Sequence, residues 1–128
     1  MDYARLGILV GWFGILAGVV AGTIQGLFFH KDNWLGGYSS WRRRMVRLAH
    51  ISFFGIGFIN LSFGLTINAL DIQKSILIPL YLFIIGEITM PIVCYLAAIK
   101  KLFRHLFFIP VLSVLIATLV FVLGGILK

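Results

Sequence analysis

One acidic residue, Glu87, interrupts a long apolar stretch and is the strongest candidate for chemistry. Met90 and Cys94 follow it at i+3 and i+7, so in a helix the three side chains share one face. Pro91 has no N–H for the carbonyl of residue 87, which leaves that oxygen free. A carboxyl group, a free carbonyl and two sulfur atoms can together serve a proton, a cation or a soft metal ion such as copper.

Glu87 also has a structural interpretation. A carboxylate inside a membrane is strongly destabilising unless it is protonated or paired, and Asn60 on a neighbouring helix can pair with it. Pro91 would then kink the helix, while Met90 and Cys94 fill the core. In a transport mechanism, by contrast, Glu87 is the exchangeable carboxyl. Asn60 and Gln25 would then line the path, and the spacing fits both interpretations.

The three histidines form a second candidate site, because His30, His50 and His105 each lie at an end of an apolar stretch. Imidazoles from different helices at equal depth are what a haem b, or a copper or zinc ion, requires. The preferred ligands are His50 and His105, with His30 as a substitute. Cys94 and Met90 are soft alternatives for copper. The competing interpretation is that the histidines are ordinary interfacial residues.

The apolar stretches that carry these residues make up most of the chain. The 128 residues are 61% hydrophobic and 12% charged, so too little polar surface exists to coat a water-soluble core. This excludes soluble enzymes. Hydropathy predicts an all-α integral membrane protein, a single four-helix transmembrane domain over residues 1–128 with spans near 6–29, 48–69, 75–99 and 106–127. We expect the first span to be retained and not cleaved as a signal peptide.

Charge gathers in two of the three connections between spans, whereas the second connection has only Asp71 and Lys74. The basic residues of the first and third connections are Lys31, Arg42, Arg43, Arg44, Arg47, Lys100, Lys101 and Arg104. Such a bias places both connections in the cytoplasm and both termini outside, in an inner membrane of bacterial type. The net charge of +7 therefore indicates insertion topology and no nucleic-acid partner. The single cysteine excludes an intramolecular disulfide.

The first connection is rich in aromatic and basic residues, and we expect it to be an amphipathic segment lying along the membrane surface. Gly36 and Gly37 mark a turn, and Ser39 or Ser40 can cap a helix that begins near Trp41. Lipid anchoring is favoured over a docking site for a partner protein. The predicted lipid-interface residues are Trp34, Tyr38, Trp41, Arg42, Arg43 and Arg44, with Met45 continuing the helical spacing.

A ladder of glycines runs along the first span. Its members are Gly7, Gly11, Gly14, Gly18, Gly22 and Gly26. A face without side chains favours close packing of a neighbouring helix, and Gly55, Gly57 and Gly64 are possible complements on the second span. The same face could instead admit a flat ligand such as a porphyrin.

Three functions fit these residues. The first is a small accessory or cofactor-binding subunit, for haem b or a metal, of a membrane redox or electron-transport assembly. The second is a proton- or cation-coupled transporter that works as an oligomer through Glu87, and the third is a purely structural subunit. The chain is similar in size to small multidrug-resistance transporters, but their membrane glutamate lies in the first helix, so no family membership is inferred.

Catalysis is not expected, because no HExxH motif or phosphate loop occurs. The expected partners are membrane lipids and either other membrane subunits or a second copy, paired through the glycine ladder.

Overall fold

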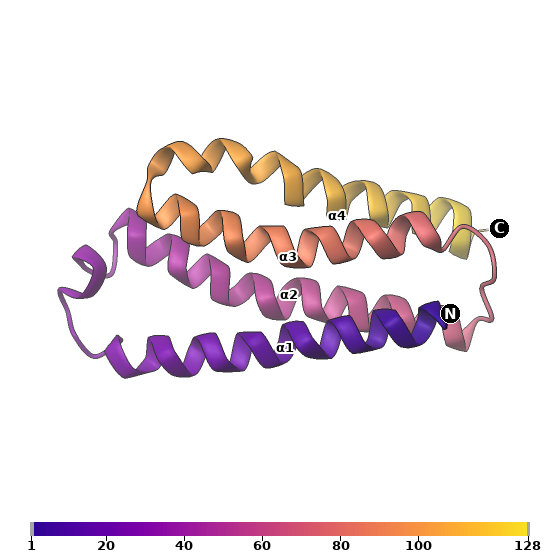
Figure 1. Cartoon of the computed structure of the whole chain (residues 1–128), viewed down its shortest axis with the longest axis horizontal. Coiled ribbons are helices and arrows are strands. Elements are labelled where there is room, and N and C mark those ends of the chain that lie inside the picture. Colours follow the sequence, from indigo (N-terminus) through magenta and orange to yellow (C-terminus); the bar gives the residue numbers. More distant parts are fainter. Residues whose placement is uncertain (1, 128) are drawn as a thin grey trace.

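The computed structural model describes residues 2–127 and is built from four long helical segments (Figure 1). These are α1 (Tyr3–Phe28), α2 (Trp41–Ala69), α3 (Leu77–Ile99) and a final segment of three parts: η2 (Lys101–Phe107), α4 (Phe108–Phe121) and η3 (Val122–Ile126). No strand occurs within residues 2–127. All four segments are long and apolar enough to cross a membrane. The predicted four-helix bundle is confirmed, and the protein is a multi-pass integral membrane protein.

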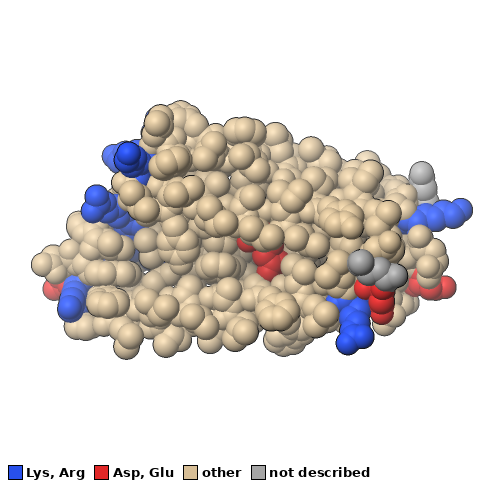
Figure 2. All heavy atoms as spheres, in the orientation of Figure 1, with Lys and Arg blue, Asp and Glu red and all other residues tan. Residues whose placement is uncertain are grey.

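The helices pack mainly in chain order: α1 on α2, α2 on α3, and α3 on α4, with a smaller contact between α1 and α3. The first and third connections lie at one end of the molecule, and the chain termini lie at the other end together with the second connection (Figure 1). Figure 2 shows basic side chains gathered at the end with the first and third connections, which we call the basic end. The assignment of that end to the cytoplasm stays a prediction.

Two polar residues explain why α1 and α2 begin earlier than their apolar stretches. The carboxylate of Asp2 accepts a hydrogen bond from the backbone N–H of Arg5 at 3.0 Å. The hydroxyl of Ser40 likewise accepts the N–H of Arg43 at 3.2 Å. Each side chain satisfies an N–H that has no partner within the helix. Ser40, one of the two predicted caps, is therefore the N-cap of α2, and the predicted start at Trp41 is confirmed.

The first connection differs from a continuous surface helix, because only the short helix η1 (Trp34–Gly36) forms within it. Gly36 and Gly37 adopt positive φ values of 89° and 96°, and Leu35 has a φ of 55°. This left-handed backbone ends the short helix and confirms the predicted turn. As a result the aromatic residues of the connection do not share one helical face, and Trp41 belongs to α2.

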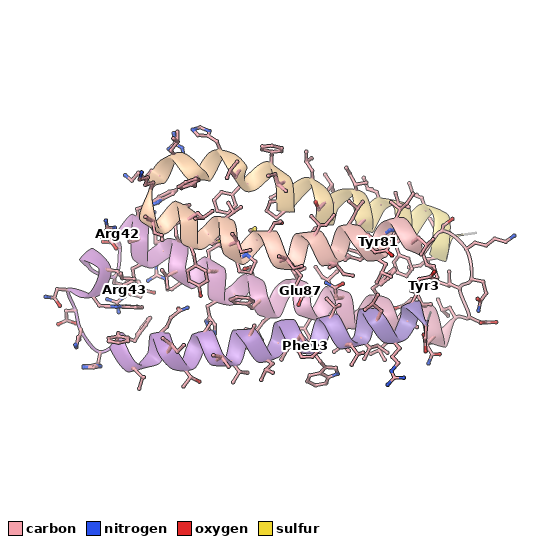
Figure 3. All side chains as sticks on the ribbon, in the orientation of Figure 1. Tyr3, Phe13, Arg42, Arg43, Tyr81 and Glu87 are labelled. Atoms are coloured by element: carbon pink, nitrogen blue, oxygen red, sulfur yellow. The ribbon has the colours of Figure 1, made fainter. Side chains whose placement is uncertain are left out.

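Arg43 lies in the first turn of α2 and packs against the first connection, so it does not face lipid as predicted. Its side chain is only 3% exposed and donates to the backbone carbonyls of Phe29, Lys31 and Asp32 at 2.9, 3.4 and 3.5 Å. The guanidinium also lies 4.6 Å from the centre of the Phe29 ring. The neighbouring residues Arg42 and Arg44 are exposed, as predicted for an interface. Arg43 therefore ties the connection to α2 (Figure 3).

The end opposite the basic end is closed by an aromatic core. Phe63 of α2 packs edge-to-face against Phe83 of α3 and Phe121 of α4, with ring centres 5.3 and 4.6 Å apart. Such pairs add to the stabilisation from apolar burial. This cluster joins α4 to the other helices, so α4 is anchored through α2 as well as through α3.

The glycine ladder packs α1 closely against α2, as the small-residue spacing predicts. A Cβ atom added at Gly11 would lie 2.5 Å from the backbone nitrogen of Leu61 and 2.6 Å from the carbonyl oxygen of Gly57. One added at Gly64 would lie 2.5 Å from a backbone carbonyl of α1. Gly57 and Gly64 are thus the complements on α2, whereas Gly55 and Gly26 have no such neighbour within 4 Å.

Candidate functional site

A buried carboxyl–amide pair lies in the middle of the membrane-spanning region. Glu87 of α3 is 6% exposed and Asn60 of α2 is fully buried. The amide nitrogen Nδ2 of Asn60 donates to Oε2 of Glu87 at 2.5 Å, and it also lies 3.3 Å from the carbonyl oxygens of Ile56 and Phe83. Three oxygen acceptors around one nitrogen fix the orientation of the amide. The pairing expected of Glu87 and Asn60 is confirmed.

The other carboxyl oxygen of Glu87 lies against α1. A Cβ atom at Gly14 would overlap Oε1 and the carboxyl carbon of Glu87. Gly14 therefore does more than bring α1 close to α2, because it leaves the space that the carboxyl group occupies. Figure 3 shows Glu87 projecting from α3 toward α1, at the level of Phe13.

The pair is short of hydrogen-bond donors. Oε1 of Glu87 and Oδ1 of Asn60 are buried and have no donor among the described residues. A buried oxygen without a donor costs about 1–3 kcal/mol, so the site favours a species that brings one. A proton on the carboxyl group fits this need, and so does a cationic or hydroxyl group next to Oε1. A further acceptor or an anion does not fit.

A groove between α1 and α3 leads to this carboxyl, and we call it the α1–α3 groove. The part that holds Glu87 has a volume of about 440 Å³ and is almost entirely apolar. Phe13 on its rim is 68% exposed, so the groove opens toward lipid. Figure 2 shows acidic atoms in the middle of this face. The residues that line it include Phe13, Ala17, Phe53, Glu87, Ile88 and Tyr95.

Gln25 lies in the same groove but apart from Glu87. It is 9% exposed, and its Nε2 donates to the hydroxyl of Tyr95 at 3.4 Å. This second part of the groove has a volume of about 650 Å³ and shares Phe13 and Tyr95 with the first. Gln25 follows Gly14 by eleven positions on α1, which is about 16.5 Å along the helix. Gln25 and Glu87 therefore line different parts of one groove, and a transport path along it stays a prediction.

The two sulfur residues predicted near Glu87 are not part of the groove wall that it lines. Cys94 is a free, fully buried thiol, and Met90 is half-buried. Neither lines the part of the groove that holds Glu87. Over residues 2–127, no three side chains of His, Cys, Asp or Glu gather in a way that could hold a metal ion.

No protein-family model matches the chain, and no curated protein or solved structure matches it either.

The histidines lie in different surroundings. His30 is exposed just after α1, and His105 is exposed on η2, which packs on α3 and α4. His50 is half-buried and faces α1, since a Cβ atom at Gly22 would lie 2.5 Å from its Nε2. Its ring meets Phe54 edge-to-face at 5.3 Å. The structure does not bring His50 and His105 together, so these two imidazoles do not form a shared ligand site. Binding of haem or copper stays a prediction.

Three residues of the site were not predicted from the sequence: Gly14 as the neighbour of Glu87, and Phe53 and Tyr95 as groove residues. Tyr95 follows Glu87 by eight residues and so lies near the same helical face. A phenol in an apolar span is a polar group, and that was the available signal. The contact of Gly14 with Glu87 depends on how α1 is rotated about its axis, which glycine spacing alone leaves undetermined.

Proposed function

We propose that the protein exchanges a proton for a hydrophobic cation at Glu87, as a small proton- or cation-coupled transporter of a bacterial-type inner membrane. The observation that carries this proposal is the buried oxygen Oε1 of Glu87, which has no donor within residues 2–127 and lies at the base of a groove open to lipid. Transport through four helices requires more than one copy to enclose a path, so the working unit is an oligomer.

The exchange follows from the chemistry of a carboxyl group in hydrocarbon. Without a ligand, Glu87 carries a proton, because an ionised side chain is costly there. A hydrophobic cation enters the groove from the lipid, the O–H bond of the carboxyl breaks, and the proton leaves to water. The carboxylate then pairs with the cation, so the charge of the site is unchanged. Asn60 donates to Oε2 in both states and keeps Oε1 directed at the ligand.

A purely structural role for the pair is the second candidate. The hydrogen bond between Asn60 and Glu87 supports it, because such bonds between helices stabilise membrane proteins without further activity. The two functions differ in one respect: a structural pair has no reason to release a proton when a cation binds.

The test is proton release on cation binding. Purified full-length protein in weakly buffered mild detergent is titrated with tetraphenylphosphonium, and pH is followed with an indicator dye. We expect saturable binding with one proton released for each bound cation, and weaker binding at lower pH because protons compete for Glu87. Glu87→Gln should release no proton and bind at least about tenfold more weakly, since its amide cannot pair with the charge.

A matched variant on the same helix is Thr89→Val. The hydroxyl of Thr89 only donates to the carbonyl of Ile85, so this change should leave binding and proton release intact. Equal binding by wild type and Glu87→Gln, or binding without proton release, would overturn the transporter proposal in favour of the structural role.

A further inference from the structure

A separate pocket, which we call the basic pocket, lies at the basic end, away from Glu87 (Figure 3). It has a volume of about 520 Å³ and is enclosed by the turn of the first connection, the first turn of α2 and the junction of α3 with η2. Two basic side chains line it, Arg42 and Lys101. Figure 3 shows Arg42 at this end of the molecule. The pocket is formed by two segments that are distant in sequence, residues 35–42 and 98–101, and not by one patch of surface charge.

The walls of this pocket are held in place. The indole N–H of Trp41 donates to the carbonyl of Ala97 at 2.7 Å, which ties the start of α2 to the end of α3. The amine of Lys101 lies 5.8 Å from the centre of the Trp41 ring. The hydroxyl of Ser40 donates to the carbonyl of Leu35 at 2.7 Å and fixes the turn on the opposite wall. These contacts fix the backbone of the two segments that carry Arg42 and Lys101, both of which line the pocket.

The electrostatics of the basic end favour an anion. Residues 29–50 and 99–110 contain eight Lys or Arg residues and a single acidic residue, Asp32. The pocket also lies at the N-terminal end of α2, where the helix dipole adds to the attraction for negative charge. Because the end of a membrane-spanning bundle sits at the headgroup level, the anions nearest to it are lipid phosphates.

An apolar hollow adjoins this pocket on the side of the membrane interior. This hollow of about 370 Å³ shares Arg42 and Ile99 with the basic pocket and is otherwise lined by apolar side chains, including Val46, and by Tyr95. Tyr95 in turn lines the α1–α3 groove. A molecule with an anionic head and a hydrocarbon chain therefore matches both parts of the site, which inorganic phosphate does not.

We infer that Arg42 and Lys101 bind the phosphate of an anionic phospholipid, with an acyl chain lying along Val46 and Ile99. This site is independent of the exchange at Glu87, and it gives the first connection a defined lipid partner beyond general attraction to the membrane surface. Each of the two charges should strengthen binding of the anionic lipid about fivefold relative to a zwitterionic one.

Trp41 lines this pocket, so its fluorescence can report lipid binding there. Full-length protein with Trp12→Phe and Trp34→Phe keeps Trp41 as its only tryptophan. This protein is reconstituted in bilayers that contain brominated phosphatidylglycerol or brominated phosphatidylcholine, and quenching gives the relative binding constant. We expect phosphatidylglycerol to be preferred at least about tenfold, and Arg42→Gln with Lys101→Gln to abolish the preference.

The control removes the same charge from the same end but outside the pocket, through Lys100→Gln with Arg104→Gln. It should retain most of the preference. Equal losses in the two double variants would overturn the inference, because general surface charge would then explain the binding. The absence of any preference in the wild type would also overturn it. So would full displacement of the brominated lipid by millimolar inorganic phosphate, which would indicate a site for free phosphate.

Discussion

At the scale of single residues, the candidate site depends on the buried side-chain amide of Asn60, which holds the carboxyl group of Glu87 by a hydrogen bond. Its Nδ2 donates to Oε2 of Glu87 and also lies 3.3 Å from two helical backbone carbonyls, so its loss leaves Oε2 without a donor in hydrocarbon. We predict that Asn60→Ala lowers the free energy of unfolding by about 1–3 kcal/mol. Titration with a denaturing detergent, followed by circular dichroism, measures this change.

Two variants sharpen that prediction. Thr66→Ala on the same helix removes an exposed hydroxyl that donates only to Ser62, so stability should stay within about 0.5 kcal/mol of wild type. Glu87→Gln keeps an oxygen acceptor for Asn60 and should be nearly as stable as wild type. A loss of stability in Glu87→Gln as large as that in Asn60→Ala would contradict the assigned hydrogen bond.

Arg43 is the second residue on which a local structure depends. Its guanidinium bonds several carbonyls of the first connection and lies against aromatic rings, including Phe29. Lysine cannot reproduce this planar arrangement of donors. We predict that Arg43→Lys increases amide hydrogen exchange over residues 29–40 by at least about tenfold, corresponding to the loss of about 1.5 kcal/mol or more. Arg44→Lys, at an exposed position, should leave exchange unchanged.

At the scale of the helices, the glycine ladder links packing to the site. Gly14 and Gly26 belong to the same ladder, but a Cβ atom at Gly14 would strike the carboxyl of Glu87, whereas one at Gly26 meets nothing within 4 Å. We predict that Gly14→Ala lowers the free energy of unfolding by about 1–3 kcal/mol and also weakens tetraphenylphosphonium binding.

Gly26→Ala is the matched control for that helix. Alanine favours helix over glycine by about 1 kcal/mol, so this variant should be neutral or slightly stabilising and should bind the cation normally. If both variants behaved alike, the close approach of α1 to Glu87 would be contradicted.

The helices themselves could be predicted from the sequence, and their mutual arrangement only in part. Long apolar runs must be helical in hydrocarbon, and Ser40 before Trp41 is a recognisable cap. In the first connection the turn at Gly36 and Gly37 was predicted, whereas the helical spacing of Trp34, Tyr38 and Trp41 did not mean that they share one helix. The left-handed backbone at Gly36 and Gly37 separates Trp34 from the helix that carries Trp41. Helical spacing of side chains indicates a shared helical face only where the backbone between them is also helical.

The candidate site was predictable to the extent that polar groups in hydrocarbon must find partners. Glu87 and Asn60 were expected to pair for this reason, and they do. Gln25 was expected to line the same path; it lines another part of the α1–α3 groove, where it pairs with Tyr95. Which polar residues meet within the bundle depends on the rotation and depth of α1 and α3, and hydropathy does not determine either.

At the scale of the whole molecule, the arrangement of helices places eight basic residues of two connections at one end. We predict that this end faces the cytoplasm. In a Cys94→Ala background, Ser39→Cys and Leu102→Cys should be shielded from an impermeant thiol reagent added to intact cells, and Gln73→Cys should be labelled. The opposite pattern would reverse the orientation and contradict the cytoplasmic placement of the basic end.

The proposed exchange requires that Glu87 is a protonated carboxyl that can be reached from the lipid through the α1–α3 groove. The most direct measurement is labelling with the hydrophobic reagent dicyclohexylcarbodiimide, which reacts with protonated carboxyl groups, followed by peptide mass spectrometry. We predict modification at Glu87 that tetraphenylphosphonium suppresses, and little reaction at this residue with a water-soluble carbodiimide. An unmodified Glu87, or one that reacts only with the water-soluble reagent, would contradict the account.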